Sequence, residues 1–270
     1  MKKMVLFSLV LAIGGVLVSC VSTAPAVSRP PDISVSYEEA LHLYNLGAIA
    51  YDAGNFSGAL DYLNQAVPLL SSDPDGEGRA RLKRAETYVA LGNLESAADD
   101  VESVIALLPN SAGAHFERAL INFRKGNAAD AQTDLDAAIT LDPNFARAYN
   151  LKGLIAKSEG DLGGALKAYD RAISIDGSYA PFYFNRAVVE VETGNYEAAI
   201  NDYTEAIMKY PDTQNTFKAQ AFCMRSELFL LLGNAKRAEI DKRQAQSLVP
   251  GACAEEETTK PKWGKGEIRD

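Results

Sequence analysis

Apolar side chains recur at a helical spacing over most of this chain, and small residues mark fixed points in the pattern. From about residue 40 to residue 250 the apolar positions follow a helical period. Alternation at a period of two residues, the sign of a half-buried strand, is rare. The pattern is interrupted by six Gly-Asn or Gly-Asp pairs, at Gly54, Gly92, Gly126, Gly160, Gly194 and Gly233, with spacings of 38, 34, 34, 34 and 39 residues. Such a period predicts stacked helical units in place of one globular core.

Alignment on these glycines shows three small residues in each unit, at seven residues before the glycine and at five and twelve residues after it. In the fourth unit they are Gly153, Ala165 and Ala172. Small residues let two helix backbones approach closely, and glycine suits the turn between them, so each unit is predicted to be a helical hairpin. Larger apolar residues, five before and nine after the glycine, are expected to fill the space between units.

Four prolines, Pro109, Pro143, Pro211 and Pro250, follow the predicted second helices, where they interrupt no interior hydrogen bond. Together these features resemble the tetratricopeptide repeat, most plainly from Tyr149 to Asp176. The resemblance implies an all-α fold, a right-handed α-solenoid of six helical hairpins over residues 37–250. Arg81 and Lys242 depart from the family pattern, which has a large aromatic residue there. The final helix is polar, as the last element of a solenoid should be. The two wider spacings predict inserted loops at residues 71–77 and around residues 212–218.

The amino terminus has a different composition. Lys2 and Lys3 precede an apolar run from Met4 to Val18, which is shorter than a membrane-spanning helix requires. The run ends in Leu17-Val18-Ser19-Cys20, which resembles the bacterial lipobox. This resemblance implies a signal peptide over residues 1–19 and an acylated Cys20 as the first mature residue. The alternative is an ordinary secretory signal in which Cys20 is incidental.

Residues 20–36 are rich in serine, proline and small residues, and this composition predicts a flexible linker between the anchor and the repeats. Several acyl chains together would anchor the protein stably in a lipid bilayer. Val21 follows the cysteine. If the organism is Gram-negative, the sorting rule of such lipoproteins implies the outer membrane, with the repeats facing the periplasm.

The charge and the reactive side chains argue against several classes of function. The net charge of −9 disfavours nucleic acid as a partner. The two histidines, His42 and His115, have no spacing typical of a metal site, and His115 occupies a packing position. No set of nucleophile, base and oxyanion donor is recognisable. We therefore expect no catalytic residue, no metal and no cofactor.

Cys223 and Cys253 lie at neighbouring ends of the predicted last hairpin. A disulfide between them is sterically feasible, and two free thiols are the alternative. The tail, residues 251–270, contains the only tryptophan, Trp263, and its composition predicts disorder. Docking of Trp263 into a groove is the alternative for this segment.

Four units share an arginine eight residues before the glycine and an aspartate eight residues after it. The pairs are Arg84 with Asp100, Arg118 with Asp134, Arg186 with Asp202, and Arg225 with Asp241. The two units that lack the arginine also lack the aspartate. This covariation predicts an ion pair between the two helices of a unit, for which arginine is well suited. A row of unpaired arginines that binds anions is the alternative.

Tetratricopeptide geometry implies that the first helices line a concave groove, with residues ten, six and three before the glycine facing it. The apolar candidates for a protein-binding groove are Tyr44, Phe116, Leu120, Phe123, Leu154, Phe184, Val188 and Val191. An apolar strip open to solvent usually marks an interaction site. Leu120 and Val188 have the alternative of packing between helices. The family's clamp for a terminal carboxylate is missing, so a helical or extended segment with apolar anchors is the expected ligand.

These features predict a membrane-anchored scaffold that binds another protein of the cell envelope. In its arrangement the chain resembles the pilotins of type IV pilus assembly and the envelope adaptors that scaffold cell-wall enzymes. The alternative function is an enzyme or a small-ligand carrier that uses the groove as a pocket.

Overall fold

The computed structural model describes residues 33–254, and the predicted signal peptide, Cys20 and Trp263 lie outside this range. The described chain consists of twelve α-helices and contains no strand. The helices are α1 (Ile33–Asp52), α2 (Phe56–Leu69), α3 (Pro74–Ala90), α4 (Leu94–Leu107), α5 (Ala112–Arg124), α6 (Ala128–Leu141), α7 (Ala146–Ser158), α8 (Leu162–Ile175), α9 (Ala180–Glu192), α10 (Tyr196–Lys209), α11 (Asn215–Leu231) and α12 (Ala235–Leu248). Consecutive pairs form six hairpins, called units 1 to 6 below, as the sequence predicts.

The repeated glycine and the residue after it end one helix and begin the next. All six turn glycines have a positive φ, between 74° and 84°, a conformation that costs glycine little because it has no Cβ. In four units the asparagine or aspartate that follows accepts a hydrogen bond from the backbone N–H three residues later, for example Asn55 from Gly58. A side-chain acceptor at this position satisfies one of the unpaired N–H groups of the new helix. A connection of three residues therefore suffices to reverse the chain.

The small residues lie where the two helices of a unit meet. Ala165 and Ala172 are fully buried, and so are their counterparts in the other units. At Gly153 the approach is close, since a methyl group there would lie 2.5 Å from the ring of Tyr169. The Tyr169 ring thus occupies the volume that a larger residue would need.

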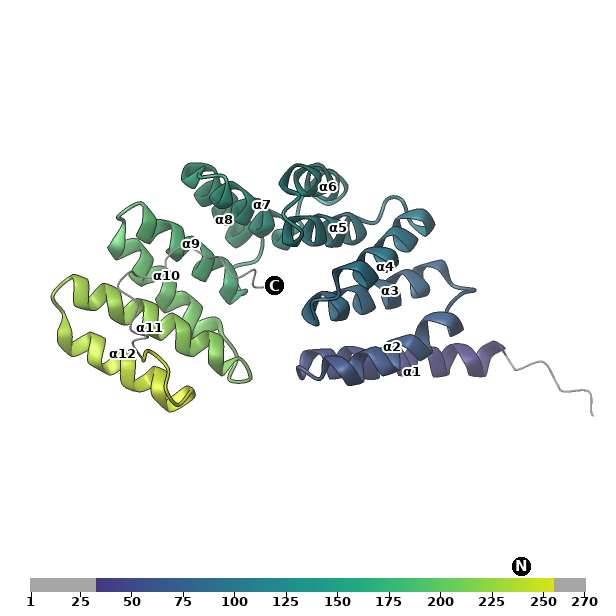
Figure 1. Ribbon diagram of the computed structural model, residues 1–270, viewed down its shortest axis with the longest axis horizontal. Coiled ribbons are helices and arrows are strands. Elements are labelled where there is room, and N and C mark those ends of the chain that lie inside the picture. The colour runs from purple at the N-terminus through teal and green to yellow at the C-terminus, as the bar shows by residue number, and fades with distance from the viewer. Residues whose placement is uncertain (1–32, 255–270) are drawn as a thin grey trace, which may run out of the picture.

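The units stack into an open arc in which unit 1 faces unit 6 across the central space (Figure 1). Contacts join the first helices of successive units, α1 to α3, α3 to α5, α5 to α7 and α7 to α9. Helices on the inner side of a curve lie closest together, so the first helices form the inner surface; α5 lies inside α6, for example (Figure 1).

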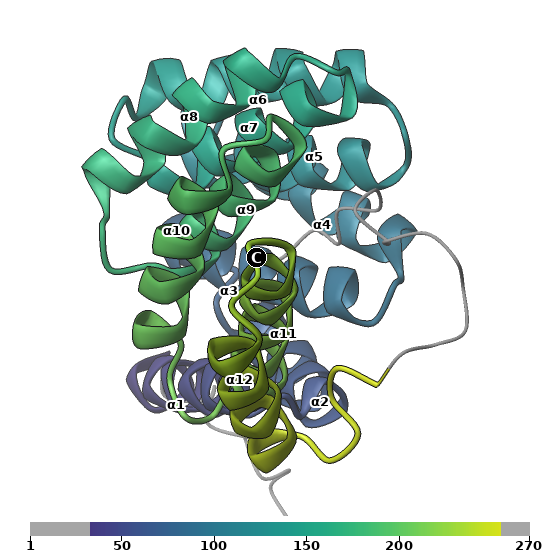
Figure 2. The same ribbon diagram turned by 90° about the vertical axis from the view of Figure 1, so that its left-hand side faces the viewer.

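The last helix lies at the end of the stack (Figure 2). Glu239, Arg243 and Gln246 are exposed there. Lys242 occupies the slot filled by the buried Tyr169 and Tyr203 in units 4 and 5. A charged residue in this slot leaves α12 a polar face, which suits the end of a solenoid.

The two sequence-based predictions of inserted loops were wrong. The inserted loops predicted at residues 71–77 and around residues 212–218 are mostly helix, because α3 and α11 have 17 residues whereas α5, α7 and α9 have 13. Four extra residues are about one helical turn, so the insertion lengthens the helix without displacing the packing face. At the amino-terminal end α1 begins at Ile33, four residues inside the predicted linker.

Candidate functional site

The inner surface of the arc is less open than the sequence suggests. Phe116, Leu120, Leu154 and Phe184 are between 2% and 6% exposed, so the prediction that they form a solvent-exposed strip was wrong. The other four candidates are half-buried, namely Tyr44, Phe123, Val188 and Val191. These four retain surface that a partner could contact.

The burial comes from the neighbouring unit. The ring of Phe116 lies 4.9 Å from the ring of Phe145 and 4.8 Å from the guanidinium of Arg147. Phe145 directly precedes α7, and Arg147 lies in its first turn. Phe184 packs on Tyr203 within its own unit, with the ring centroids 5.3 Å apart. Phe116 is thus covered by the following unit, and a single unit cannot show this.

Unit 6 has no following unit in the described chain, and apolar residues of α11 remain exposed there. Leu230 is 46% exposed and Leu231 is 62% exposed. Leu230 stands three residues before its glycine, at the same inner position as Phe123 and Val191. Three partly exposed apolar residues of the inner surface, Phe123, Val191 and Leu230, therefore lie at the ends of first helices, near the turns.

The polar side chains of the inner surface are paired with one another. Lys157 and Glu192 form an ion pair at 3.0 Å, and Arg147 lies 3.7 Å from both Glu86 and Glu117. Two buried asparagines join units 4 and 5, since Asn185 donates a hydrogen bond to Asn150 at 2.9 Å. This balance of charge suits a partner segment of mixed polarity.

The predicted arginine–aspartate pairs are confirmed in all four units. Nε and Nη2 of each arginine donate to the two oxygens of its aspartate, at distances of 2.6–3.0 Å. The aspartates are at most 6% exposed. Paired, two-point hydrogen bonding of this kind suits a buried carboxylate and leaves no row of free guanidinium groups for anions.

The same arginines also connect each unit to the preceding one, which the sequence analysis missed. Nη1 donates to a residue ten after the preceding glycine, at 2.6–3.1 Å; the acceptors are Asn64, Glu102, Asp170 and Thr204. Unit 4 has Lys152 in place of arginine, and Lys152 keeps this contact through Asp136 at 3.2 Å. Unit 1 has Leu46 at this position, and no earlier unit precedes it in the described chain. Each of these arginines therefore makes two contacts, one with the aspartate of its own unit and one with the preceding unit.

One carboxyl group near these pairs has a strongly shifted pKa. Burial, together with the neighbouring charge of Asp202, raises the pKa of Glu190 to about 7. Its Oε2 atom is buried and accepts no hydrogen bond. At the equivalent position of unit 3, Asn122 donates to Asp134 at 3.2 Å. The position favours a neutral donor beside the aspartate.

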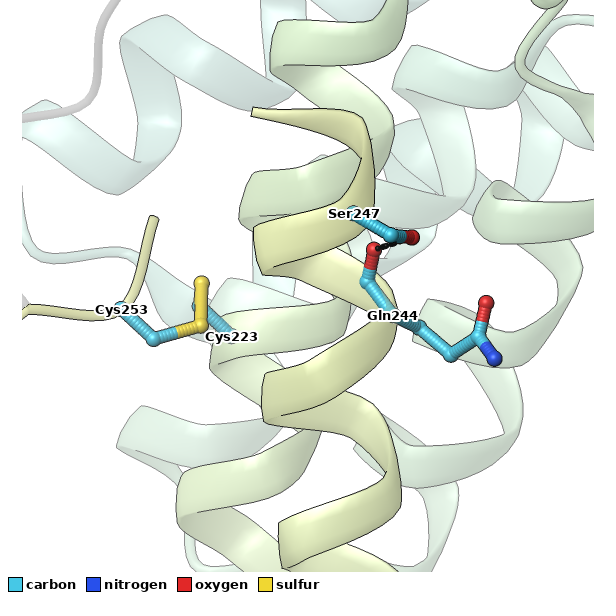
Figure 3. Close-up of a disulfide and its surroundings, with 4 residues drawn as sticks. All are labelled: Cys223, Gln244, Ser247 and Cys253. Atoms are coloured by element: carbon cyan, nitrogen blue, oxygen red, sulfur yellow. Dashed lines mark hydrogen bonds between the residues drawn. A yellow bond between two sulfur atoms is a disulfide. The ribbon is translucent and has the colours of Figure 1, made fainter. Parts of the chain in front are cut away.

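Cys223 and Cys253 form a disulfide in the structure, with their Cα atoms 5.3 Å apart (Figure 3). Cys253 lies beyond the end of α12, and the bond joins it to the first half of α11. The segment from Val249 to Cys253 packs on Cys223. In unit 6 this segment covers the position that the following unit covers in unit 3.

The described residues offer no metal site or membrane span. No group of three or more histidine, cysteine, aspartate or glutamate side chains in residues 33–254 is placed to hold a metal ion. None of the helices described is both long and apolar enough to cross a bilayer. His115 packs at a turn, with Nε2 3.0 Å from the carbonyl oxygen of Pro109.

Comparison with known sequences and structures agrees with this geometry. A profile of the tetratricopeptide repeat matches residues 28–74, 82–131 and 123–181, and a second profile of the same description matches residues 180–213. No curated protein sequence matches the chain.

Several solved structures share the fold. PilF of Pseudomonas aeruginosa is 17% identical, with 80% of this chain and 95% of that chain covered and a TM-score of 0.61. A thermophilic tetratricopeptide protein of Thermus thermophilus is 19% identical, with 71% of this chain and 99% of that chain covered and a TM-score of 0.60. A tetratricopeptide repeat protein of Parabacteroides merdae is 22% identical, with 78% of each chain covered and a TM-score of 0.57. Identities this low show the fold alone.

Proposed function

This chain belongs to the tetratricopeptide-repeat family, and we propose that it is a lipid-anchored scaffold that binds another protein of the cell envelope. Its repeats form an arc of the kind that mediates protein–protein interaction, and proteins of this family are generally scaffolds without catalytic activity. The observation that carries the proposal is the inner surface of the arc. Phe123, Val191 and Leu230 are only partly covered there and occupy equivalent positions in three units.

The anchoring part of the proposal rests on the sequence around Cys20. An apolar run that ends in a small residue and a cysteine fits the substrate of a lipoprotein signal peptidase. In a Gram-negative cell we propose the outer membrane, facing the periplasm, as the location. Roles in pilus assembly and in the positioning of cell-wall enzymes are two proposals that suit a tethered scaffold.

The binding surface is tested by partner capture from detergent-solubilised envelopes. Phe116 and Phe184 are unsuitable for mutation because both are buried, and their loss would damage the fold. We therefore compare Phe123→Glu combined with Val191→Glu against Met208→Glu, which alters an exposed residue on the second helix α10. The proposal expects a specific partner that is captured by the wild type and by the Met208 variant and is lost with the double variant. Equal capture by all three proteins would reject the inner surface.

The anchor is tested separately with Cys20→Ala. We expect the wild type to sediment with membranes and to carry acyl chains on its first mature residue, as measured by mass spectrometry of the amino-terminal peptide. The variant should lose the acyl mass and leave the membrane fraction. An unmodified Cys20 in the wild type would reject the lipoprotein assignment without affecting the repeats.

A further inference from the structure

A hollow lies between the first half of α3 and the loop that joins α4 to α5. Its volume is about 470 Å³, in the range of small ligand pockets. We call it the α3–α5 hollow, and its lining consists of Asp75, Gly78, Arg79, Leu82 and the loop residues 107–111. The extra turn of α3, which the sequence suggested to be a loop, supplies Asp75 and thus part of one wall.

Leu82 in the hollow is left partly uncovered because one residue in unit 3 is a glycine. In unit 4 the residue thirteen before the turn glycine is Arg147, and its guanidinium lies 4.8 Å over Phe116 of the preceding unit. The equivalent residue of unit 3 is Gly113, and the residue that it leaves uncovered is Leu82. Leu82 is consequently half-buried whereas Phe116 is buried. A Cβ atom at Gly113 would lie 3.6 Å from Leu82, an ordinary contact, so the space is open to a side chain.

The floor and rim differ in chemistry. Leu82, Leu107, Leu108 and the ring of Pro109 give an apolar lining, and Leu107 is 38% exposed. On α3, Asp75 and Arg79 stand one helical turn apart, and both are exposed without an ion pair between them. An apolar floor with one charge of each sign at its edge can orient a bound segment.

A helix terminus adds a partial positive charge to the rim. Ser111 lines the hollow and is the N-cap of α5, where its hydroxyl accepts a hydrogen bond from the backbone N–H of Ala114. The amino-terminal end of a helix carries a partial positive charge and stabilises a nearby anion. Together with the Arg79 guanidinium it favours one carboxylate at the rim, whereas Asp75 disfavours a second carboxylate.

We propose that the α3–α5 hollow binds an apolar side chain of a partner protein that has an acidic residue next to it. The side chain fills the space over Leu82 that Arg147 fills over Phe116 in the following unit. The carboxylate pairs with Arg79. This inference rests on the proposed function, since it names the segment that a protein partner would present, and it places that segment at the junction of units 2 and 3.

Photo-crosslinking tests the hollow directly, because it records weak binding and its position. The probe is a hexapeptide in which benzoylphenylalanine precedes aspartate between glycine and serine spacers. The full-length protein in detergent is irradiated with it, and the crosslinked residues are identified by mass spectrometry. We expect crosslinks at Leu82 or at residues 107–109, and at least tenfold fewer with a probe that has lysine in place of aspartate.

Three variants distinguish specific binding in the hollow from nonspecific binding of the probe. Gly113→Arg fills the space as unit 4 does and should reduce crosslinking at least tenfold, whereas Gly163→Arg, on the exposed first turn of α8, should leave it unchanged. Arg79→Glu should reverse the preference so that the lysine probe crosslinks better. Urea unfolding verifies that each variant is folded.

The result that would overturn the proposal is the absence of crosslinks in this region, or crosslinking that Gly113→Arg does not reduce. Partner capture distinguishes this failure from that of the proposed function. If capture still depends on Phe123 and Val191, the scaffold function stands and only the hollow is rejected. If the hollow binds the probe and partner capture does not depend on Phe123 and Val191, the hollow stands and the inner surface around those two residues is rejected.

Discussion

Replacing Glu190 with glutamine should remove a pH-dependent loss of stability. Glu190 lies on α9 beside the pair formed by Arg186 and Asp202, and burial together with that carboxylate raises its pKa to about 7. A protonated Glu190 can donate a hydrogen bond, as Asn122 does to Asp134 in unit 3. Glutamine supplies a neutral donor at every pH.

The expected change in the free energy of unfolding follows from the pKa shift of Glu190. A pKa raised from 4.5 to about 7 corresponds to about 3.4 kcal/mol if converted fully. Glu190 is only half-buried, although one of its oxygens is not exposed, so solvent screening reduces the effect to about 1–2 kcal/mol. Because the folded-state pKa lies above the unfolded value, this contribution is fully present below pH 4.5 and is lost as the pH rises through about 7.

Urea unfolding of the wild type and Glu190→Gln, between pH 5 and pH 8.5, measures the effect. The difference in unfolding free energy should shift in favour of the variant by about 1–2 kcal/mol over this range. The other titrating groups are common to both proteins and cancel in the difference. As a converse test, Asn122→Glu should introduce the same pH dependence in unit 3. A wild-type-minus-variant difference that stays constant with pH would refute the assignment.

Three further predictions concern the packing of the units. Arg186→Asp or Asp202→Arg alone should lower the free energy of unfolding in urea by about 3–5 kcal/mol, because each leaves a buried charge unpaired. The variant that carries both substitutions should recover part of this loss, and no recovery would contradict the pairing. Cys253→Ser should lower the unfolding free energy by about 2–4 kcal/mol, and a reducing agent should have the same effect on the wild type but none on the variant. Gly153→Ala should cost about 1–3 kcal/mol, because a tyrosine ring fills the space of the new methyl group. Gly163→Ala, where the nearest atom is 3.8 Å away, should stay within about 1 kcal/mol of wild type, and equal losses for both glycines would contradict the packing argument.

The sequence by itself determined the fold and the interactions within a unit. The turn glycines, the small residues and the arginine–aspartate pairs recur at fixed distances along the chain, and a helix converts a fixed distance in sequence into a fixed place on one face. Because the two helices of a hairpin are joined by a three-residue turn, their register is fixed as well. Arg186 and Asp202 could therefore be paired without coordinates.

The tertiary structure decided what lies between units. Phe116 is buried because Phe145 and Arg147 cover it, and Leu82 is left half-buried because Gly113 cannot. The sequence places Phe116 on an inner face but does not state how much of that face the following unit covers. The sequence also did not predict the longer α3. Four added residues widen the spacing between turn glycines just as an inserted loop would, but they form about one helical turn and keep the packing face of the helix in register. Exposure depends on the approach of two surfaces from different units, and this approach is set by the volumes of side chains that are distant in sequence.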